Sequence, residues 1–142
     1  MIDSKSLIHE SASIADNVKI GAYVVIDKNV SIGEGTVIKE YAVIRENTTI
    51  GKNNLIYQFA TIGEEPQDLK FHGEHTSCTI GDNNIIREYS SIHRGTKDGI
   101  SDTEIGNNNL LMAYTHVAHD CVIAEDCILS NAASLAWHVK LE

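Results

Sequence analysis

Isoleucine recurs at every sixth position through the first half of the chain. The unbroken series is Ile2, Ile8, Ile14, Ile20, Ile26, Ile32, Ile38, Ile44, Ile50, Ile56 and Ile62. It resumes at Ile80, Ile86 and Ile92, and after a one-residue change of phase it continues with Ile105, Leu111, Val117, Ile123, Leu129, Leu135 and Leu141. A small or β-branched residue stands two places earlier, as at Ala12, Val18, Val24 and Thr36. This period matches neither a helix nor a simply alternating strand.

A six-residue period is typical of a short strand followed by a turn. Two positions of each hexad point inward, in keeping with the two-residue period of a pleated strand. β-Branched residues favour the strand, and glycine or asparagine favours the corner. The pattern therefore predicts an all-β parallel solenoid in which each coil buries its aliphatic residue against the next coil.

Hexads in which glycine follows the isoleucine, as at Gly21, Gly33 and Gly51, resemble those of the left-handed β-helix family. In that family three hexads form one triangular coil, so the aliphatic positions of this chain give about seven coils. We expect them to form a single domain over residues 1–142. The left hand is implied by the resemblance alone, because parallel crossovers in general favour the right hand.

Two polar segments interrupt the ladder, at about residues 63–79 and 93–104. Neither continues the pattern of core positions. Insertions into a solenoid become surface loops, often on its binding face. The first segment carries Gln67, Asp68 and Lys70, which makes it the stronger candidate for ligand binding. The alternative is that both segments are plain linkers.

Charge and composition narrow the possible partners. The 142 residues carry a net charge of −9, which argues against nucleic-acid binding because phosphate recognition needs a basic surface. No apolar run approaches the ~18 residues of a membrane span, and the N-terminus lacks the apolar core of a signal peptide. We therefore expect a cytoplasmic protein with no membrane insertion. Cys78, Cys121 and Cys127 lack metal-binding or redox spacing and are expected to be buried thiols.

The stretch THVAHDC contains the side chains best suited to chemistry. His119 followed by Asp120 suits a general base with an adjacent carboxylate to orient it, because the imidazole pKa of ~6.5 lies near working pH. A zinc site completed by neighbouring subunits and plain surface histidines are the alternatives. With 18 residues in a coil, Trp137 is expected to stack over His119 and His138 over Asp120. His138 and His116 then lie near His119 without an obvious convergence of ligands.

Three longer stretches resemble the UDP-N-acetylglucosamine O-acyltransferases of lipid A biosynthesis. They are IYQFATIGEEPQDLK at 56–70, IREYSSIHRGT at 86–96 and NNLLMAYTHVAHDC at 108–121. The resemblance covers essentially the whole chain and includes both loops in position. The hexads are shared by many acyltransferases, whereas the first loop and the H-x-x-H-D segment are far more discriminating.

The resemblance implies an activity and an assembly. Members of this family are cytoplasmic homotrimers that transfer a 3-hydroxyacyl chain from acyl carrier protein to the 3-hydroxyl of UDP-N-acetylglucosamine. Their sites lie in clefts between neighbouring subunits. No metal and no bound cofactor is implied.

The resemblance also implies roles for individual residues. His119 is expected to deprotonate the sugar hydroxyl, which then attacks the thioester directly, while Asp120 orients and polarises the imidazole. His116 and His138 are expected to line the site and contact the substrates. A further three residues fall where the first loop of the family meets the sugar nucleotide: Gln67, Asp68 and Lys70. Lys70 is expected to face the phosphates.

Trp137 departs from the pattern of the family. The family usually reads L-A-G-H-V where this chain has Trp137 in place of the glycine, and the backbone N–H at that glycine helps to hold the developing oxyanion. Trp137 keeps an N–H and so remains a candidate oxyanion donor. Its indole is expected to shorten the acyl pocket, change the acceptor or block the site, unless it folds away or packs at the trimer interface.

The family also continues for several more coils and ends in a helical domain, neither of which is found within residues 1–142. In the family these parts carry the residues that hold the uridine end, the residues that line the distal acyl pocket and the basic residues that dock acyl carrier protein. Three functions therefore remain open: an acyltransferase of this family, a sugar O- or N-acyltransferase that uses a short acyl-CoA, and a catalytically silent trimeric scaffold.

Overall fold

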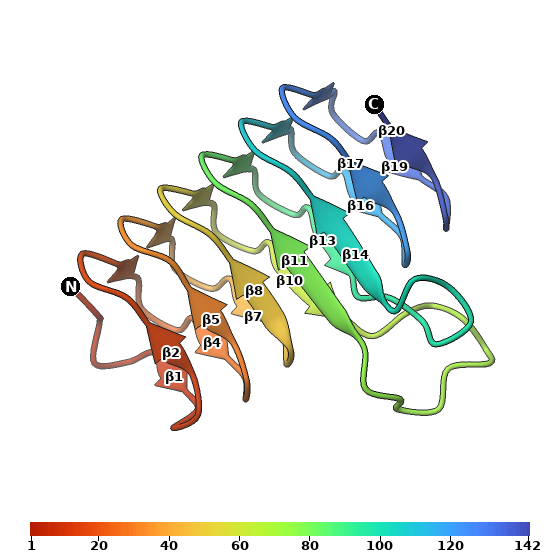
Figure 1. Cartoon of the computed structure of the whole chain (residues 1–142). Helices are drawn as coiled ribbons and strands as arrows, with labels where there is room; N and C mark the ends of the chain where they lie inside the picture. The colour runs from red at the N-terminus through yellow and green to blue at the C-terminus, as the bar shows by residue number, and fades with distance from the viewer.

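The six-residue ladder becomes a stack of coils, each of which contributes one short strand to each of three parallel sheets (Figure 1). The computed structural model describes all of residues 1–142 and contains no helix. Two sheets have seven strands and one has six, which confirms the predicted all-β parallel solenoid of about seven coils. No helix has the length and hydrophobicity that a membrane span requires.

The strands succeed one another around the coil from the first sheet to the second and then to the third. The first sheet contains β1 (Leu7–Ile8), β4 (Val25–Ile26), β7 (Val43–Ile44), β10 (Thr61–Glu64), β13 (Ser91–His93), β16 (His116–Val117) and β19 (Ser134–Leu135). The second contains β2 (Ser13–Ile14), β5 (Ser31–Ile32), β8 (Thr48–Ile50), β11 (Ser77–Ile80), β14 (Asp102–Ile105), β17 (Val122–Ile123) and β20 (Lys140–Leu141). The third contains β3 (Lys19–Ile20), β6 (Val37–Ile38), β9 (Leu55–Ile56), β12 (Ile85–Ile86), β15 (Leu110–Leu111) and β18 (Ile128–Leu129).

The aliphatic ladder forms the core because its members pair in register between neighbouring coils. Ile26 pairs with Ile44, and Ile62 pairs with Ile92. The buried apolar side chains form one cluster of 24 residues, so each coil is stabilised mainly by the coils above and below it. Ile2, which the ladder also includes, is 48% exposed because it has a neighbouring coil on one side only.

The corners between sheets require a tight turn in every coil. Asn17, Asn47 and Asn83 occupy such corners with a left-handed backbone conformation, at φ of 58°, 59° and 58°, which asparagine tolerates better than most residues. Gly51 is needed for another reason: a Cβ at this position would lie 2.6 Å from the carbonyl oxygen of Gly81 on the next coil. The predicted preference for asparagine is therefore borne out at these corners, whereas Tyr23, Tyr41 and Phe59 adopt the same left-handed conformation at another corner, at φ of 60°, 63° and 64°.

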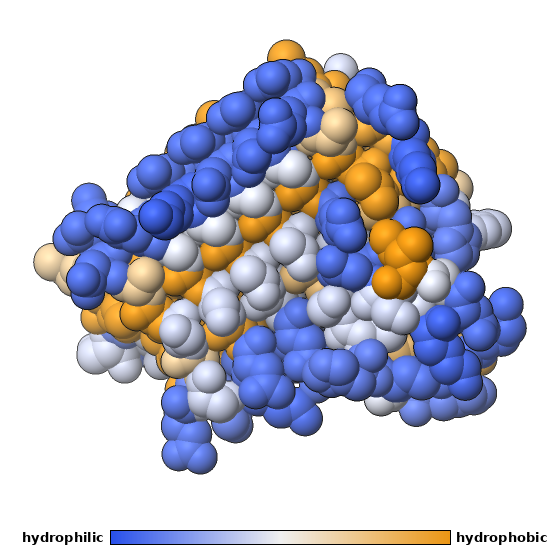
Figure 2. Space-filling view, viewed as in Figure 1, coloured by the Kyte–Doolittle hydropathy of each residue, from blue (hydrophilic) through white to orange (hydrophobic).

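Both inserted loops leave the molecule at the same corner, between the first and second sheets (Figure 1). They span residues 65–76 and 94–101, and they are shorter than the expected ranges of 63–79 and 93–104. The difference arises because β11 continues its backbone pairing with β14 from Ser77 to Ile80. Figure 2 shows that hydrophilic residues cover much of this corner. The loops therefore form one polar projection beside the first sheet.

The three cysteines are free thiols. Cys78 and Cys121 are buried, as expected, and burial raises the pKa of both thiols. The expectation is wrong for Cys127, which is only partly buried, because it precedes β18, the edge strand of the third sheet.

Candidate active site

A histidine–carboxylate pair lies at the corner from which the loops project. His119 and Asp120 lie one residue beyond the end of β16, and the two side chains are joined by a 2.8 Å hydrogen bond between His119 Nδ1 and Asp120 Oδ2. The carboxylate fixes the proton on Nδ1, which leaves Nε2 of the imidazole as the atom able to accept a proton. Both residues are buried, at 7% and 3% exposure.

The second loop explains this burial, because it closes over the Asp120 carboxylate. The Thr96 backbone N–H donates to Oδ1 at 2.9 Å, the Thr96 hydroxyl donates to Oδ2 at 2.6 Å, and the Ile100 N–H donates to Oδ1 at 3.1 Å. A Cβ on Gly99 would collide with the carboxylate, so glycine is the residue that lets the loop approach this closely. Thr96, Gly99 and Ile100 were not singled out from the sequence, because they lie 20 to 24 residues from Asp120 along the chain.

The donors around Asp120 also set its charge. Burial on its own raises the pKa of this carboxyl group, but the Thr96 hydroxyl, the Thr96 N–H and His119 together lower the pKa below its ordinary value. Asp120 is therefore ionised at neutral pH. A buried anion in contact with an imidazole stabilises the positive charge that the ring acquires when it takes a proton.

The first loop forms one side of a cleft above this pair. A cavity of ≈ 390 Å³ is lined by Gln67, Asp68, Leu69, Lys70, His119, Trp137 and His138. The Lys70 ammonium group forms no ion pair within the chain, and its backbone N–H donates to Asp68 Oδ1 at 3.0 Å. The cavity lining therefore combines an ammonium group that has no ion-pair partner with the Asp68 carboxylate and the His119 imidazole. Every first-loop residue singled out from the sequence lines this cavity.

A second cavity of ≈ 330 Å³ lies on the other side of the imidazole. It is lined by Gln67, His93, His116, Ala118, His119, Ser134, Leu135, Ala136 and Trp137. The His116 Nδ1 lies 2.7 Å from the Ser91 hydroxyl, and its ring meets the ring of His93 edge-on at 4.9 Å. The sequence identified His116 but missed His93, although His93 lies within the quoted stretch IREYSSIHRGT.

The two additional histidines are held in the neutral form. Burial, followed by repulsion from His116, lowers the pKa of His93 to about 4. Burial also lowers the pKa of His116, against an opposing effect of hydrogen bonding to the Ser91 backbone. The second cavity therefore offers neutral imidazoles, which can both donate and accept hydrogen bonds.

Trp137 lies in the wall between the two cavities, together with Gln67 and His119. Its ring is stacked on His119, with centroids 6.3 Å apart and planes inclined by 9°, as the 18-residue coil predicts. The side chain remains 64% exposed, and the Trp137 N–H makes no hydrogen bond to a backbone carbonyl. The indole therefore does not fold away from the site, and the backbone N–H of Trp137 remains available as a donor.

His138 completes the cluster around the carboxylate. Its ring meets the ring of His119 edge-on at 5.3 Å, and its Nδ1 lies 3.9 Å from Asp120 Oδ2. Ligand atoms of His119, Asp120 and His138 all lie within 4.8 Å of one another, a spacing that a metal ion could bridge. Asp120 already accepts four hydrogen bonds, which engage its lone pairs. The arrangement favours an oriented base over a metal ligand set.

Two family descriptions match parts of this chain. The family of the bacterial transferase hexapeptide (six repeats) matches residues 102–135, and that of the GMPPB C-terminal domain matches residues 2–67. Each match covers less than half of the chain.

Relatives longer than this chain match almost all of its sequence. The acyl-[acyl-carrier-protein]–UDP-N-acetylglucosamine O-acyltransferases of Aliarcobacter butzleri and Xylella fastidiosa are each 52% identical over 141 residues, which is 99% of this chain and 54% of theirs. The chain thus spans about half the length of the curated relatives it matches.

Solved structures agree with the sequence comparison. A structure from Acinetobacter baumannii superimposes with a TM-score of 0.97 at 47% identity, covering 98% of this chain and 54% of the other. The UDP-N-acetylglucosamine acyltransferase of Bacteroides fragilis gives a TM-score of 0.96 at 46% identity, with coverage of 99% and 55%. These matches confirm the left-handed parallel β-helix. By sequence and by structure, the chain belongs to the family of UDP-N-acetylglucosamine O-acyltransferases.

Proposed function

We propose that this chain transfers a 3-hydroxyacyl group from acyl carrier protein to the 3-hydroxyl of UDP-N-acetylglucosamine, the first step of lipid A biosynthesis. One observation carries the proposal: two cavities of different character meet at a single oriented imidazole, that of His119. A transferase that brings two substrates together directly needs this arrangement. The two substrates are those named for its relatives, the acyl-[acyl-carrier-protein]–UDP-N-acetylglucosamine O-acyltransferases.

His119 is the general base in this proposal. Its Nε2 takes the proton of the sugar hydroxyl while the oxygen attacks the thioester carbonyl, and ionised Asp120 stabilises the resulting imidazolium. The tetrahedral intermediate carries an oxyanion, for which the backbone N–H of Trp137 is the candidate donor. The intermediate collapses as the C–S bond breaks, and the departing thiolate recovers the proton from His119.

In this proposal the two substrates bind on opposite sides of His119. The cavity beside Lys70 suits the sugar nucleotide, because an unpaired ammonium group attracts phosphate, and Gln67 and Asp68 offer polar contacts there. The cavity that includes Ala118 and Leu135 is the more apolar of the two and suits the acyl thioester. His116 and His138 contribute one hydrogen-bonding group to each side.

The proposal includes the assembly and the compartment. We infer a cytoplasmic homotrimer in which a neighbouring copy completes each cleft, and a reaction that needs no metal and no cofactor. The open, half-exposed cleft around Trp137 is consistent with a partner surface on that side. Sedimentation of the purified chain tests the assembly, because a trimer has three times the 15.6 kDa mass of one chain.

Replacement of the base tests the function. We expect His119→Ala to lower kcat by at least ~10², the contribution typical of a general base, while calorimetry shows UDP-N-acetylglucosamine binding within a few-fold of the unmodified chain. The matched control is His9→Ala, which removes an exposed histidine on the first coil and should keep full activity. Transfer at the normal rate by the His119→Ala variant would remove His119 from the role of base.

A second candidate is favoured by the position of Trp137. Because its indole stacks on His119 and divides the cleft, the same chemistry with a shorter acyl donor fits the site. A catalytically silent scaffold predicts a different result: sugar-nucleotide binding without turnover by any donor. Parallel assays with short and long 3-hydroxyacyl donors distinguish these possibilities.

A further inference from the structure

We propose that Arg94 is a positioning residue, which fixes the first loop (residues 65–76) in the conformation that holds Gln67, Asp68 and Lys70 beside His119. The inference rests on the proposed function for its kinetic consequences but not for its structural ones. Arg94 directly follows His93 at the end of β13 and is 4% exposed. A fully charged side chain at such depth requires an explanation.

The contacts of Arg94 begin at the strand that leads into the first loop. Its backbone N–H donates to the carbonyl of Glu64 at 2.9 Å, and its Nη1 donates to the carbonyl of Gly63 at 3.1 Å. Gly63 has a φ of 79° and lies where the pairing of β10 with β13 shifts in register. A Cβ there would collide with the Thr48 hydroxyl. The bulge at Gly63 thus turns its carbonyl toward the guanidinium group.

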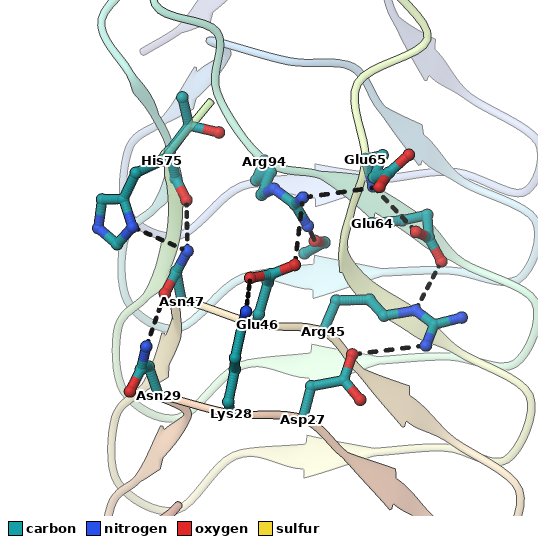
Figure 3. Close-up of polar contacts among 12 residues, drawn as sticks. Asp27, Lys28, Asn29, Arg45, Glu46, Asn47, Glu64, Glu65, His75 and Arg94 are labelled. Atoms are coloured by element: carbon teal, nitrogen blue, oxygen red, sulfur yellow. Dashed lines mark hydrogen bonds and ion pairs between the residues drawn. The ribbon is translucent and has the colours of Figure 1, made fainter. Parts of the chain in front are cut away.

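Arg94 also reaches into the loop itself. Its Nη2 lies 4.0 Å from a carboxylate oxygen of Glu65 and 3.7 Å from one of Glu46, and its Cζ lies 5.5 Å from the centre of the Phe71 ring. Glu46 is in turn paired with Lys28 at 3.3 Å. Figure 3 shows Arg94 between Glu46 on one side and Glu65 on the other. One side chain therefore contacts the beginning and the middle of the loop.

The other end of the loop is held separately. The Asn47 side-chain amide donates to the Thr76 carbonyl at 3.3 Å and lies 3.3 Å from His75 Nδ1. Asn29, one coil below, donates to Asn47 at 3.4 Å (Figure 3). Because both ends are attached to the same corner of the coils beneath, the loop has a defined base, and Arg94 fixes the half that leads to the substrate-facing residues.

These contacts are a weak source of stability. The Arg94 Nε is buried and has no hydrogen-bond partner, and neither carboxylate lies close to the guanidinium group. Buried ion pairs of poor geometry often stabilise a protein no better than apolar residues of similar size. A role in orienting the loop accounts for Arg94 better than a role in holding the coils together.

The sequence position of Arg94 adds to this argument. His93, the preceding residue, lines the second cavity, and Thr96, two residues later, holds Asp120. Arg94 therefore connects the first loop to the short segment that carries both of these residues. Movement of its side chain changes the approach of Lys70 to His119 and leaves the base and its carboxylate in contact.

Arg94→Met tests the proposal, because methionine keeps much of the apolar volume and removes every polar contact of the side chain. We expect amide hydrogen exchange in residues 65–76 to accelerate by about tenfold or more, with unchanged exchange in β5 to β9. In turnover assays the KM for UDP-N-acetylglucosamine should rise about tenfold while kcat changes less than threefold. Arg94→Lys, which keeps the charge without the fork of donors, should give intermediate values.

Arg45→Met is the matched control. Arg45 belongs to the same network, with contacts to Glu64 at 2.9 Å and Asp27 at 3.4 Å. It makes no direct contact with the loop and is linked to it only through Glu64, whose carboxylate accepts the Glu65 N–H at 3.0 Å. Unchanged loop exchange in Arg94→Met, equal acceleration in Arg45→Met, or acceleration throughout the chain would each overturn the proposal. If the unmodified chain neither binds nor turns over the sugar nucleotide, the proposed function fails while the exchange measurement still decides the role of Arg94.

Discussion

The Asp120 side chain shows how one buried carboxylate fixes the orientation of a neighbouring imidazole. Its corner position has a φ of 61°, a left-handed conformation that aspartate tolerates, and this places the carboxylate between His119 and the second loop. Four donors then hold it in one orientation. A base whose orientation is fixed before substrate arrives loses little entropy in the reaction.

The Trp137 side chain provides a test of donor preference at the same scale. We expect Trp137→Gly to join the two cavities, because the indole is part of the wall between them. Turnover of long acyl donors relative to short ones should rise at least about tenfold, equivalent to 1.4 kcal/mol in the activation barrier. Competition assays with donors of different length measure the ratio directly.

Trp137→Phe is the control for this experiment, since it keeps an aromatic ring over His119 and should stay close to the original ratio. The interpretation of the indole as a divider would be wrong if the Gly variant left donor preference unchanged. Because the side chain is 64% exposed, either substitution should leave the fold intact.

Among the elements, the loop of residues 94–101 is the one on which the candidate base depends. It passes over Asp120 with Gly99 at its closest approach and supplies three of the four donors to the carboxylate. A strand of the regular coil has no spare N–H groups for this purpose, because the ladder engages them. The loop is therefore part of the site although it is not expected to touch either substrate.

Thr96→Val tests this dependence with little change of shape. Loss of one charge-assisted hydrogen bond is expected to lower kcat by about tenfold and to leave KM nearly unchanged. Since the Thr96 hydroxyl lowers the pKa of Asp120, its removal raises that pKa, and the acidic limb of the kcat–pH profile should move to higher pH. Thr96→Ser keeps the hydroxyl and should restore both kcat and the position of the acidic limb. If the acidic limb does not move in Thr96→Val, the Thr96 hydroxyl does not control the Asp120 carboxylate.

The elements also show what a sequence can and cannot reveal. The core was predictable because its period is local: each isoleucine marks one strand, three successive strands make one coil, and the 18-residue coil correctly stacks Trp137 on His119. An aromatic column along another corner was equally regular but was overlooked: Tyr23, Tyr41, Phe59, Tyr89 and Tyr114, with centroids 5.0 to 5.3 Å apart. Its first three members are one coil apart in sequence, so the signal was present.

The closure over Asp120 and the network around Arg94 were not predictable in this way. They join residues of irregular loops to residues one or more coils away, and no periodicity relates the two. Loop composition indicated polarity and a surface position, and it identified Gln67, Asp68 and Lys70. It gave no indication that Thr96 and Gly99 would reach the carboxylate.

On the scale of the whole molecule, stability depends on pH through a buried histidine. The pKa of His93 is about 4 in the folded chain, against 6.5 for an ordinary histidine. Between these values the unfolded chain binds a proton that the folded chain does not. The free energy of unfolding therefore falls as the pH is lowered from 6.5 to 4, by about 3 kcal/mol from this group, and the contribution is fully present above pH 6.5.

His93→Gln removes this effect and should flatten the pH dependence. Urea unfolding at intervals between pH 4 and 7 measures it as the difference between variant and original curves. His72→Gln, which replaces an exposed histidine of the first loop, should reproduce the original dependence. If the free energy of unfolding depends on pH in the same way in His93→Gln and in the original chain, the buried imidazole of His93 is not the source of the pH dependence.

The regular stack of coils has a consequence for how this site can change. The first loop leaves the β10 coil, and His119, the proposed base, follows β16, which is two strands further along the same sheet. Neighbouring strands are separated by about 4.8 Å. The distance from the loop to His119 along the sheet is therefore a whole multiple of this spacing. Gain or loss of one coil between them changes the distance from the loop to His119 by nearly the length of a sugar ring, and no smaller change is possible by this route. A change in substrate size is therefore expected to arise from altered side chains and loop lengths, because the distance between the loop and His119 can change only in steps of one strand spacing.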